Sequence, residues 1–334
     1  AFMDTGHLPS NNYQEDVYAE VVQKGLNYLL ANPHAGLMDI PAHSDGIAVR
    51  DSDTAGGKAP GKGAHLFTRT YANGLALLAI LTAYPDEATA KAKIISGGPF
   101  NGWSYYELIV EALDLIKWYQ GDGDKRGSWF YGITQTASRY DGSTQQWPTM
   151  VIKAAEDRWG IVSPQWVIDN AVHAMQNRLS SPGGGIGYSS GSSSVDVGKT
   201  GGGLVTYSLA KMPLNDPVMA NALSYAGANW FSATPRKEGG PGWVSNLYAM
   251  FAIKKGLDLA DVETVTTSEG ERDWQRDLSS WLLGRAENLP ASFGSSKRSP
   301  AYSFGQNADG TWEDTWVFIA RGGKNIRAAV GVGI

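Results

Sequence analysis

Three aspartates of this 334-residue chain lie where a carboxylate could do chemistry. Asp141, Asp196 and Asp314 each come shortly before an apolar segment with helical spacing. A carboxylate at a helix start accepts hydrogen bonds from unpaired N–H groups and is stabilised by the helix dipole, so capping explains each of them. Together they could also form an acidic site for a cation or a polar ligand. Glu313 stands beside Asp314, and such paired acids can perform general acid/base catalysis.

Aromatic residues form the second candidate group, because the chain contains 12 Trp and 15 Tyr. Aromatic rings can stack on sugars and steady cations, or they can wedge neighbouring helices together. Both readings stay open, and on either reading these side chains lie at loop-to-helix junctions, where a binding site could open. The candidates are Trp103, Trp129, Trp147, Tyr188, Trp243 and Trp312.

Metal and cofactor sites are not expected. The chain has no Cys, which excludes thiolate ligands, iron–sulfur clusters and a Cys nucleophile. A calcium loop is suggested by GDGDKRG at 121–127, but Arg126 and Ile133 stand where two of its oxygen ligands belong. The histidines show no metal-binding spacing. We therefore predict an exposed turn at 121–127, no metal and no cofactor.

Composition also narrows the partners and the location. A net charge of −5 without any basic run leaves nothing to neutralise a phosphate backbone, so nucleic acid is not expected as a partner. No apolar stretch approaches the roughly 20 residues that span a bilayer, so membrane insertion is not expected either. The absence of Cys and the first residue, Ala1, favour a processed, exported protein in the extracellular space or the periplasm.

Apolar residues recur with helical spacing and divide the chain into pairs of helices joined by long Gly- and Ser-rich loops. The first helix of each pair carries more charge and is expected to face water, whereas the second is expected to be buried. Small residues such as Gly201 let the second helices approach closely. The expected first helices are 16–31, 105–120, 164–179, 216–232 and 272–287, and the expected second helices are 68–84, 143–159, 200–212, 242–257 and 311–321.

Several of these segments resemble bacterial proteins built from prenyltransferase and squalene-oxidase repeats. The resemblance rests on YDGSTQQWPTMVIKAAEDRWGI at 140–161, SPGGGIGYSSG at 181–191 and KTGGGLVTYSLAKM at 199–212. It implies an all-α fold, a single (α/α) toroid of about five helix pairs over residues 1–327. In such a toroid the starts of the second, inner helices face a shared mouth.

The chain departs from the enzymes of that family at the residues that carry their chemistry. Protein prenyltransferases are similar in holding zinc with Asp, Cys and His, and Cys is absent here. Triterpene cyclases resemble one another in a DxDDTA motif, which protonates an alkene. The nearest string here runs from Asp51 to Ala55 and lacks the acid before Asp53. Neither activity is therefore expected.

These observations favour a non-catalytic extracellular module that self-assembles or that binds glycans or surface proteins. Copies of the chain are the first expected partner, because the apolar tail at 328–334 could pair with a neighbouring subunit or cover its own core. Two alternatives stay open. One is a divergent terpenoid-cyclase-like or carbohydrate-active enzyme that uses the mouth, and the other is a carrier that holds a small molecule in the central cavity.

Overall fold

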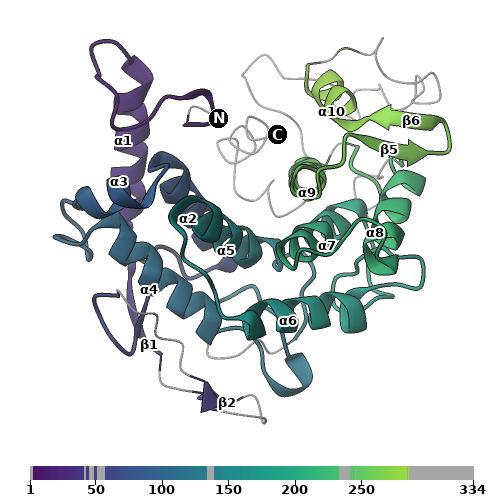
Figure 1. Ribbon diagram of the computed structural model, residues 1–334, viewed down its shortest axis with the longest axis horizontal. Helices are drawn as coiled ribbons and strands as arrows, with labels where there is room; N and C mark the ends of the chain where they lie inside the picture. Colours follow the sequence, from purple (N-terminus) through teal and green to yellow (C-terminus); the bar gives the residue numbers. More distant parts are fainter. Residues whose placement is uncertain are drawn as a thin grey trace. The chain divides into compact units, whose positions relative to one another are not determined.

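The computed structural model describes residues 3–40, 43–44, 49–50, 57–133, 139–232, 241–244, 246–283 and 285 (Figure 1). The chain divides into two compact units, Ala1–Ala174 and Met175–Ile334, here called unit 1 and unit 2. The described strands pair only as two-stranded antiparallel hairpins between or beside helices. This confirms the prediction that the fold is built mainly of helices.

Unit 1 consists of helices and two small hairpins. Its helices are α1 (Val17–Leu30), α2 (Thr70–Ala83), α3 (Glu87–Ala92), α4 (Tyr105–Trp118), α5 (Gln146–Trp159) and α6 (Gln165–Ala174), with short 3-10 turns at Met3–Thr5 and Gly123–Lys125. One hairpin pairs β1 (Gly36–Asp39) with β4 (Lys62–His65), and the other pairs β2 (His43–Ser44) with β3 (Val49–Arg50).

Unit 2 begins with a π-helical turn, Met175–Leu179. Its helices are α7 (Val197–Leu209), α8 (Pro217–Ala228), α9 (Leu247–Leu259) and α10 (Trp274–Leu282). A hairpin of β5 (Thr264–Thr267) and β6 (Gly270–Asp273) connects α9 to α10.

Helix starts are specified locally by side-chain caps. Asp16 and Asp216 cap α1 and α8, and Ser104 forms a capping box with Glu107 at α4. Nine of the ten predicted helices match these helices to within about five residues, since caps and apolar spacing are local signals. The tenth, 311–321, and the tail 328–334 lie outside the described residues.

The charged helix α4 departs from the expectation that first helices face water. Glu111, Asp114 and Lys117 are each at most 2% exposed. The reason is the β1–β4 hairpin, which was not predicted: β4 packs on α4 so closely that a Cβ at Gly63 would lie 2.6 Å from the Leu115 Cβ. Each buried charge has a partner within the unit, because Lys117 pairs with Asp114 at 2.6 Å and one oxygen of the Glu111 carboxylate accepts from the Ala59 backbone N–H at the same distance.

The more apolar helices pack as neighbours inside each unit. In unit 1 α2 lies against α5, and in unit 2 α7 lies against α9 (Figure 1). Glycine makes the second contact possible, since a Cβ at Gly201 would lie 2.5 Å from the backbone of Ala252 and one at Gly256 would lie 2.7 Å from the Gly201 carbonyl oxygen. The prediction of close approach through small residues is confirmed here.

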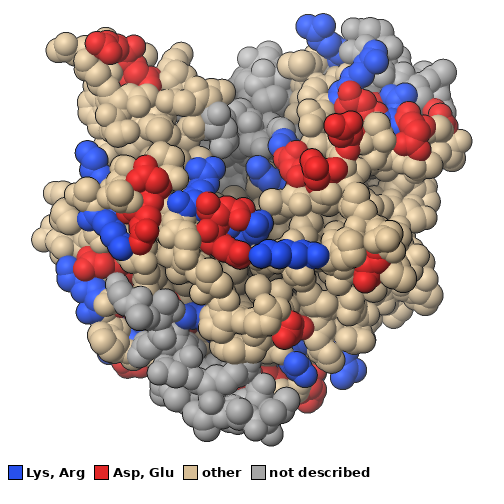
Figure 2. Space-filling view, viewed as in Figure 1, with Lys and Arg blue, Asp and Glu red and all other residues tan. Residues whose placement is uncertain are grey.

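Among the described helices, none combines the length and apolarity needed to cross a membrane. Figure 2 shows that Lys and Arg side chains are interspersed with Asp and Glu on the face in view. That mixture gives this face no single-sign field of the kind that a phosphate backbone would require.

Candidate functional site

The best-defined polar site of unit 1 lies where α2 and α5 begin. The segment 130–133 runs antiparallel to residues 68–70, because the Thr70 amide donates to the Tyr131 carbonyl at 3.0 Å and the Ile133 amide donates to the Thr68 carbonyl at 3.1 Å. This pairing places the Tyr131 side chain next to the first turn of α2. The long loop after α4 is thereby fixed at the start of α2.

Gln145 fixes the same loop at the start of α5. Its side-chain amide donates to the Trp129 carbonyl at 2.9 Å and accepts from the Trp129 amide at 3.2 Å. Trp129 itself is fully buried, and its indole N–H donates to the Ile116 carbonyl at 2.9 Å. Of the two predicted roles for Trp129, the structure therefore shows packing and anchoring.

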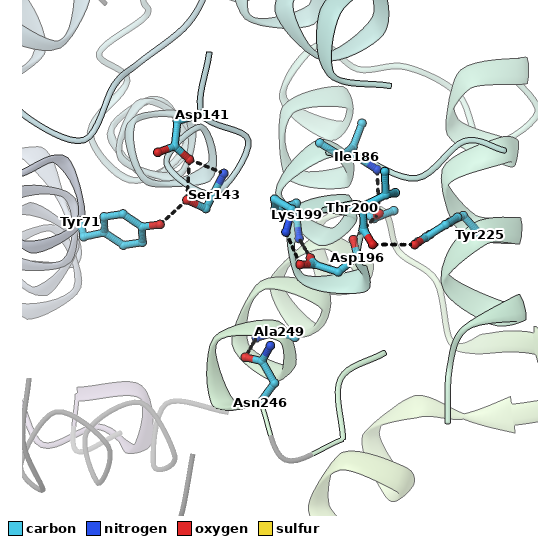
Figure 3. A network of polar contacts seen from close by, with 11 residues as sticks. Tyr71, Asp141, Ser143, Ile186, Asp196, Lys199, Thr200, Tyr225, Asn246 and Ala249 are labelled. Atoms are coloured by element: carbon cyan, nitrogen blue, oxygen red, sulfur yellow. Dashed lines mark hydrogen bonds and ion pairs between the residues drawn. The ribbon is translucent and has the colours of Figure 1, made fainter. Parts of the chain in front are cut away.

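A chain of side-chain hydrogen bonds joins the two helix starts (Figure 3). The Tyr71 hydroxyl, on the first turn of α2, donates to the Ser143 Oγ. Ser143 donates in turn to the Asp141 Oδ1, from its hydroxyl at 2.5 Å and from its backbone amide at 3.0 Å. Asp141 therefore organises the turn before α5 and does not cap the helix, whose N-cap residue is Gln145.

Aromatic rings surround this chain of hydrogen bonds. The Tyr71 ring lies 5.7 Å from the Tyr131 ring and 5.4 Å from the Trp147 ring, between centroids. The Arg69 guanidinium carbon lies 5.0 Å from the Tyr131 centroid. Tyr71 and Tyr131 are half-buried and Arg69 is exposed, whereas Trp147 is buried. The rings thus form a partly exposed aromatic surface above buried polar groups.

Gln146, the first residue of α5, is a site residue that the sequence did not reveal. Its side chain is fully buried, yet within the described part of the chain neither its amide nitrogen nor its amide oxygen has a hydrogen-bond partner. Burying both groups unsatisfied costs free energy. The only sequence signal is a glutamine among apolar positions of a buried helix. We call Arg69, Tyr71, Tyr131, Asp141, Ser143, Gln146 and Trp147 the α2–α5 cluster.

Asp196 has a different position in unit 2, at the start of α7 (Figure 3). Its Oδ1 accepts from the Lys199 amide at 2.8 Å, and its Oδ2 pairs with the Lys199 ammonium. Thr200 donates to the Asp196 carbonyl at 2.7 Å and accepts from the Ile186 amide at 3.0 Å, which ties the Gly- and Ser-rich loop to the helix. The capping interpretation of Asp196 is therefore confirmed.

Tyr225 of α8 fixes the other end of that loop. Its hydroxyl donates to the Val195 carbonyl at 3.1 Å. Burial, and to a lesser degree the negative charge of Asp196, raise the pKa of Tyr225 to about 12. The phenol therefore keeps its proton, and with it this hydrogen bond, across the neutral range.

The other predicted site residues that the structure describes pack within their own units. Trp103 in unit 1 is half-buried against Phe100, 5.4 Å between ring centroids. In unit 2, Trp243 is fully buried 5.7 Å from the Trp230 ring, and Tyr188 is half-buried within the loop that precedes α7. Three further candidates, Trp312, Glu313 and Asp314, and the Asp51–Asp53 string lie outside the described residues.

The described residues contain no group of three or more His, Asp or Glu side chains that could hold a metal ion. Within the segment 121–127, Gly123–Lys125 form a 3-10 turn in which Asp124 is exposed, whereas Asp122 is half-buried, so the predicted turn is present but only partly exposed. Comparison with known proteins finds no family model, no curated sequence and no solved structure that matches this chain.

Proposed function

We propose that the chain is a non-catalytic binding module and that the α2–α5 cluster binds a carbohydrate. The observation that carries this proposal is the Tyr71 side chain, whose half-exposed ring lies between two other aromatic rings while its hydroxyl is hydrogen-bonded to Ser143. A sugar ring presents an apolar face and a rim of hydroxyl groups. It needs an aromatic surface with nearby polar groups of fixed orientation.

The cluster supplies each of these needs. Tyr71 and Tyr131 offer aromatic surface, and the exposed Arg69 offers hydrogen-bond donors at its edge. Since the cluster is fixed to the starts of α2 and α5, a ligand would meet groups that are already ordered, which reduces the entropy lost on binding.

The proposal extends to the fold, the cellular location and the self-association of the chain. The adjacent packing of α2 with α5 and of α7 with α9 supports assigning each pair to the inner helices of an α/α toroid related to prenyltransferase and squalene-oxidase repeats. The absence of Cys supports an exported module in the extracellular space or the periplasm. Such a module would also associate with its own copies. Assembly through the tail 328–334 stays a prediction.

A glycan-binding screen followed by calorimetry tests the function. We expect the wild-type chain to bind at least one class of oligosaccharide and Tyr71→Ala to weaken that binding about tenfold, equivalent to roughly 1.4 kcal/mol. Tyr13→Ala is the matched control, because Tyr13 is an exposed tyrosine that belongs neither to the cluster nor to a helix. Absence of binding, or equal effects of the two variants, would reject the proposal. Turnover of a bound oligosaccharide that disappears in Asp141→Asn would support the enzyme alternative instead.

A further inference from the structure

Helix α1 carries more apolar surface than unit 1 buries. Its buried face consists of Ala19, Val22, Leu26 and Leu30, whose spacing is that of one side of an amphipathic helix. A second apolar arc lies beside it, about 100° wide at the helical angle per residue. This arc is exposed, and it consists of Val17 (65% exposed), Tyr18 (46%), Val21 (52%), Gly25 and Tyr28 (76%).

A single apolar face is enough to hold a helix on a core, so the second arc requires a different explanation. Four large apolar side chains on one exposed helix face are typical of an interaction surface. Gly25 at its centre strengthens the argument. A mid-helix glycine costs about 1 kcal/mol relative to alanine, and a Cβ there would meet no atom within 4 Å in this chain. The open space at Gly25 can admit a side chain from another molecule.

We propose that α1 pairs with α1 of a second copy of this chain in an antiparallel, two-fold symmetric dimer. The arc is complementary to itself under such an axis. Placing the axis at position 23 sets Tyr18 of one copy opposite Tyr28 of the other and sets Val21 opposite the space at Gly25. The large side chain thus meets the small one, and the two aromatic pairs lie at the ends of the contact.

Charge at the edge of the arc favours the same arrangement. Glu20 and Lys24 lie along one edge, both exposed, and pair within the helix at 2.8 Å. With the axis at position 23, Glu20 of one copy lies opposite position 26 of the other, only two residues or about 3 Å along the helix from that copy's Lys24. These long side chains can span that offset, so two ion pairs can form between the copies. A lipid surface fits less well, because interfacial helices carry Lys and Arg along their polar edges, whereas the acidic Glu20 borders this arc together with Lys24.

The contact is small, so the dimer should be weak. The helix has 14 residues and is about 21 Å long. One helix face of that length buries less than the roughly 1,200 Å² of a standard interface. Association is therefore expected between about 10 µM and 1 mM, the range of weak complexes. This inference does not depend on ligand binding.

Light scattering across that concentration range tests the proposal with Val21→Lys. We expect the mean mass of the wild-type chain to rise toward twice the monomer mass and that of Val21→Lys to stay at the monomer. Val162→Lys is the matched control, because Val162 is a valine of similar exposure, 69%, outside α1. Circular dichroism checks that each variant keeps its helices. A wild-type chain that is still monomeric at about 1 mM, or a dimer that survives Val21→Lys, would overturn the proposal.

The absence of Cys provides a second test that leaves the apolar arc intact. Under mild oxidation, Glu20→Cys chains mixed with Lys24→Cys chains should form a covalent dimer across the two copies. Chains with Asp169→Cys, an exposed position on α6, should not. Equal cross-linking in the two experiments, or none in the first, would contradict the antiparallel arrangement.

Discussion

The Tyr71 hydroxyl donates a hydrogen bond to the Ser143 side chain, and this contact joins residues that are 72 positions apart. One residue lies on the first turn of α2 and the other lies in the turn that leads into α5. Because Asp141 accepts from both the hydroxyl and the amide of Ser143, the orientation of the Tyr71 ring is set by two helices. The proposed binding surface is therefore ordered before any ligand arrives.

Tyr71→Phe tests this hydrogen bond by removing the hydroxyl while keeping the ring. We expect the free energy of unfolding to fall by about 0.5–1.5 kcal/mol, the usual net contribution of one hydrogen bond. Ser143→Ala should cost more, because it also removes the hydrogen bond from the Ser143 hydroxyl to Asp141. In chemical denaturation of both single variants and the double variant, the losses should not add, since both remove the same contact. Fully additive losses would show that the contact does not contribute.

Gln146→Met should stabilise the protein and leave ligand binding nearly unchanged. The change removes two buried, unsatisfied polar groups and keeps a similar volume, so the free energy of unfolding should rise by about 1–3 kcal/mol. The amide is fully buried and does not meet a ligand on the exposed aromatic surface, so affinity should change little. Thermal unfolding and calorimetry measure the two effects.

The adjacent residue provides a control of opposite sign. Gln145→Met should destabilise the protein, because the Gln145 amide makes hydrogen bonds with the Trp129 backbone. If Gln146→Met also destabilised the protein, the cost assigned to its unsatisfied amide would be wrong.

The helix starts could be predicted from the sequence because their signals are local. Asp16, Asp196 and Asp216 cap helices at the expected places, and the glycine run at 201–203 marks the close contact of α7 with α9. A cap or a small residue acts on neighbouring residues, so its effect is visible in a short window of sequence.

The burial of α4 and the composition of the site could not be predicted in this way. Lys117 and Asp114 are buried because a hairpin from a distant loop covers them, and the strands of that hairpin are only four residues long. Gln146 resembles any helical glutamine until the neighbouring helix and loop are placed around it. Asp141 was expected to cap α5, but the turn geometry places it too early in the chain. Long-range packing decides all three outcomes.

Gly201→Ala should destabilise unit 2, since the added methyl group would meet the backbone of Ala252 and Ile253 at 2.5 Å. Backbone atoms of a packed helix cannot give way as a flexible side chain can. The expected loss is about 1–3 kcal/mol, the usual cost of overpacking, despite the better helix propensity of alanine. Urea unfolding measures it.

Gly25→Ala in α1 is the matched control, because it also replaces a mid-helix glycine but meets no neighbouring atom. At low protein concentration, where the proposed α1–α1 dimer is dissociated, Gly25→Ala should stabilise the protein by about 1 kcal/mol. Equal effects of the two substitutions would show that α7 and α9 are not in close contact.

Alkaline pH should weaken the contact between Tyr225 and the loop that precedes α7. Burial and the charge of Asp196 raise the pKa of Tyr225 to about 12, above the value of about 10 for an unfolded tyrosine. The folded state thus holds this proton more tightly than the unfolded state. The resulting stability is fully present below about pH 10 and is lost as the pH rises through about 12.

Tyr225→Phe removes both the titrating group and the hydrogen bond to Val195, so it should cost about 0.5–1.5 kcal/mol at neutral pH. Above pH 10 this variant should then lose less stability than the wild type. Denaturant unfolding of the two proteins at several pH values measures the difference, because the other buried tyrosines contribute equally to both. Parallel stability curves up to about pH 12 would mean that Tyr225 does not release its proton in this range and that its environment is not the one described.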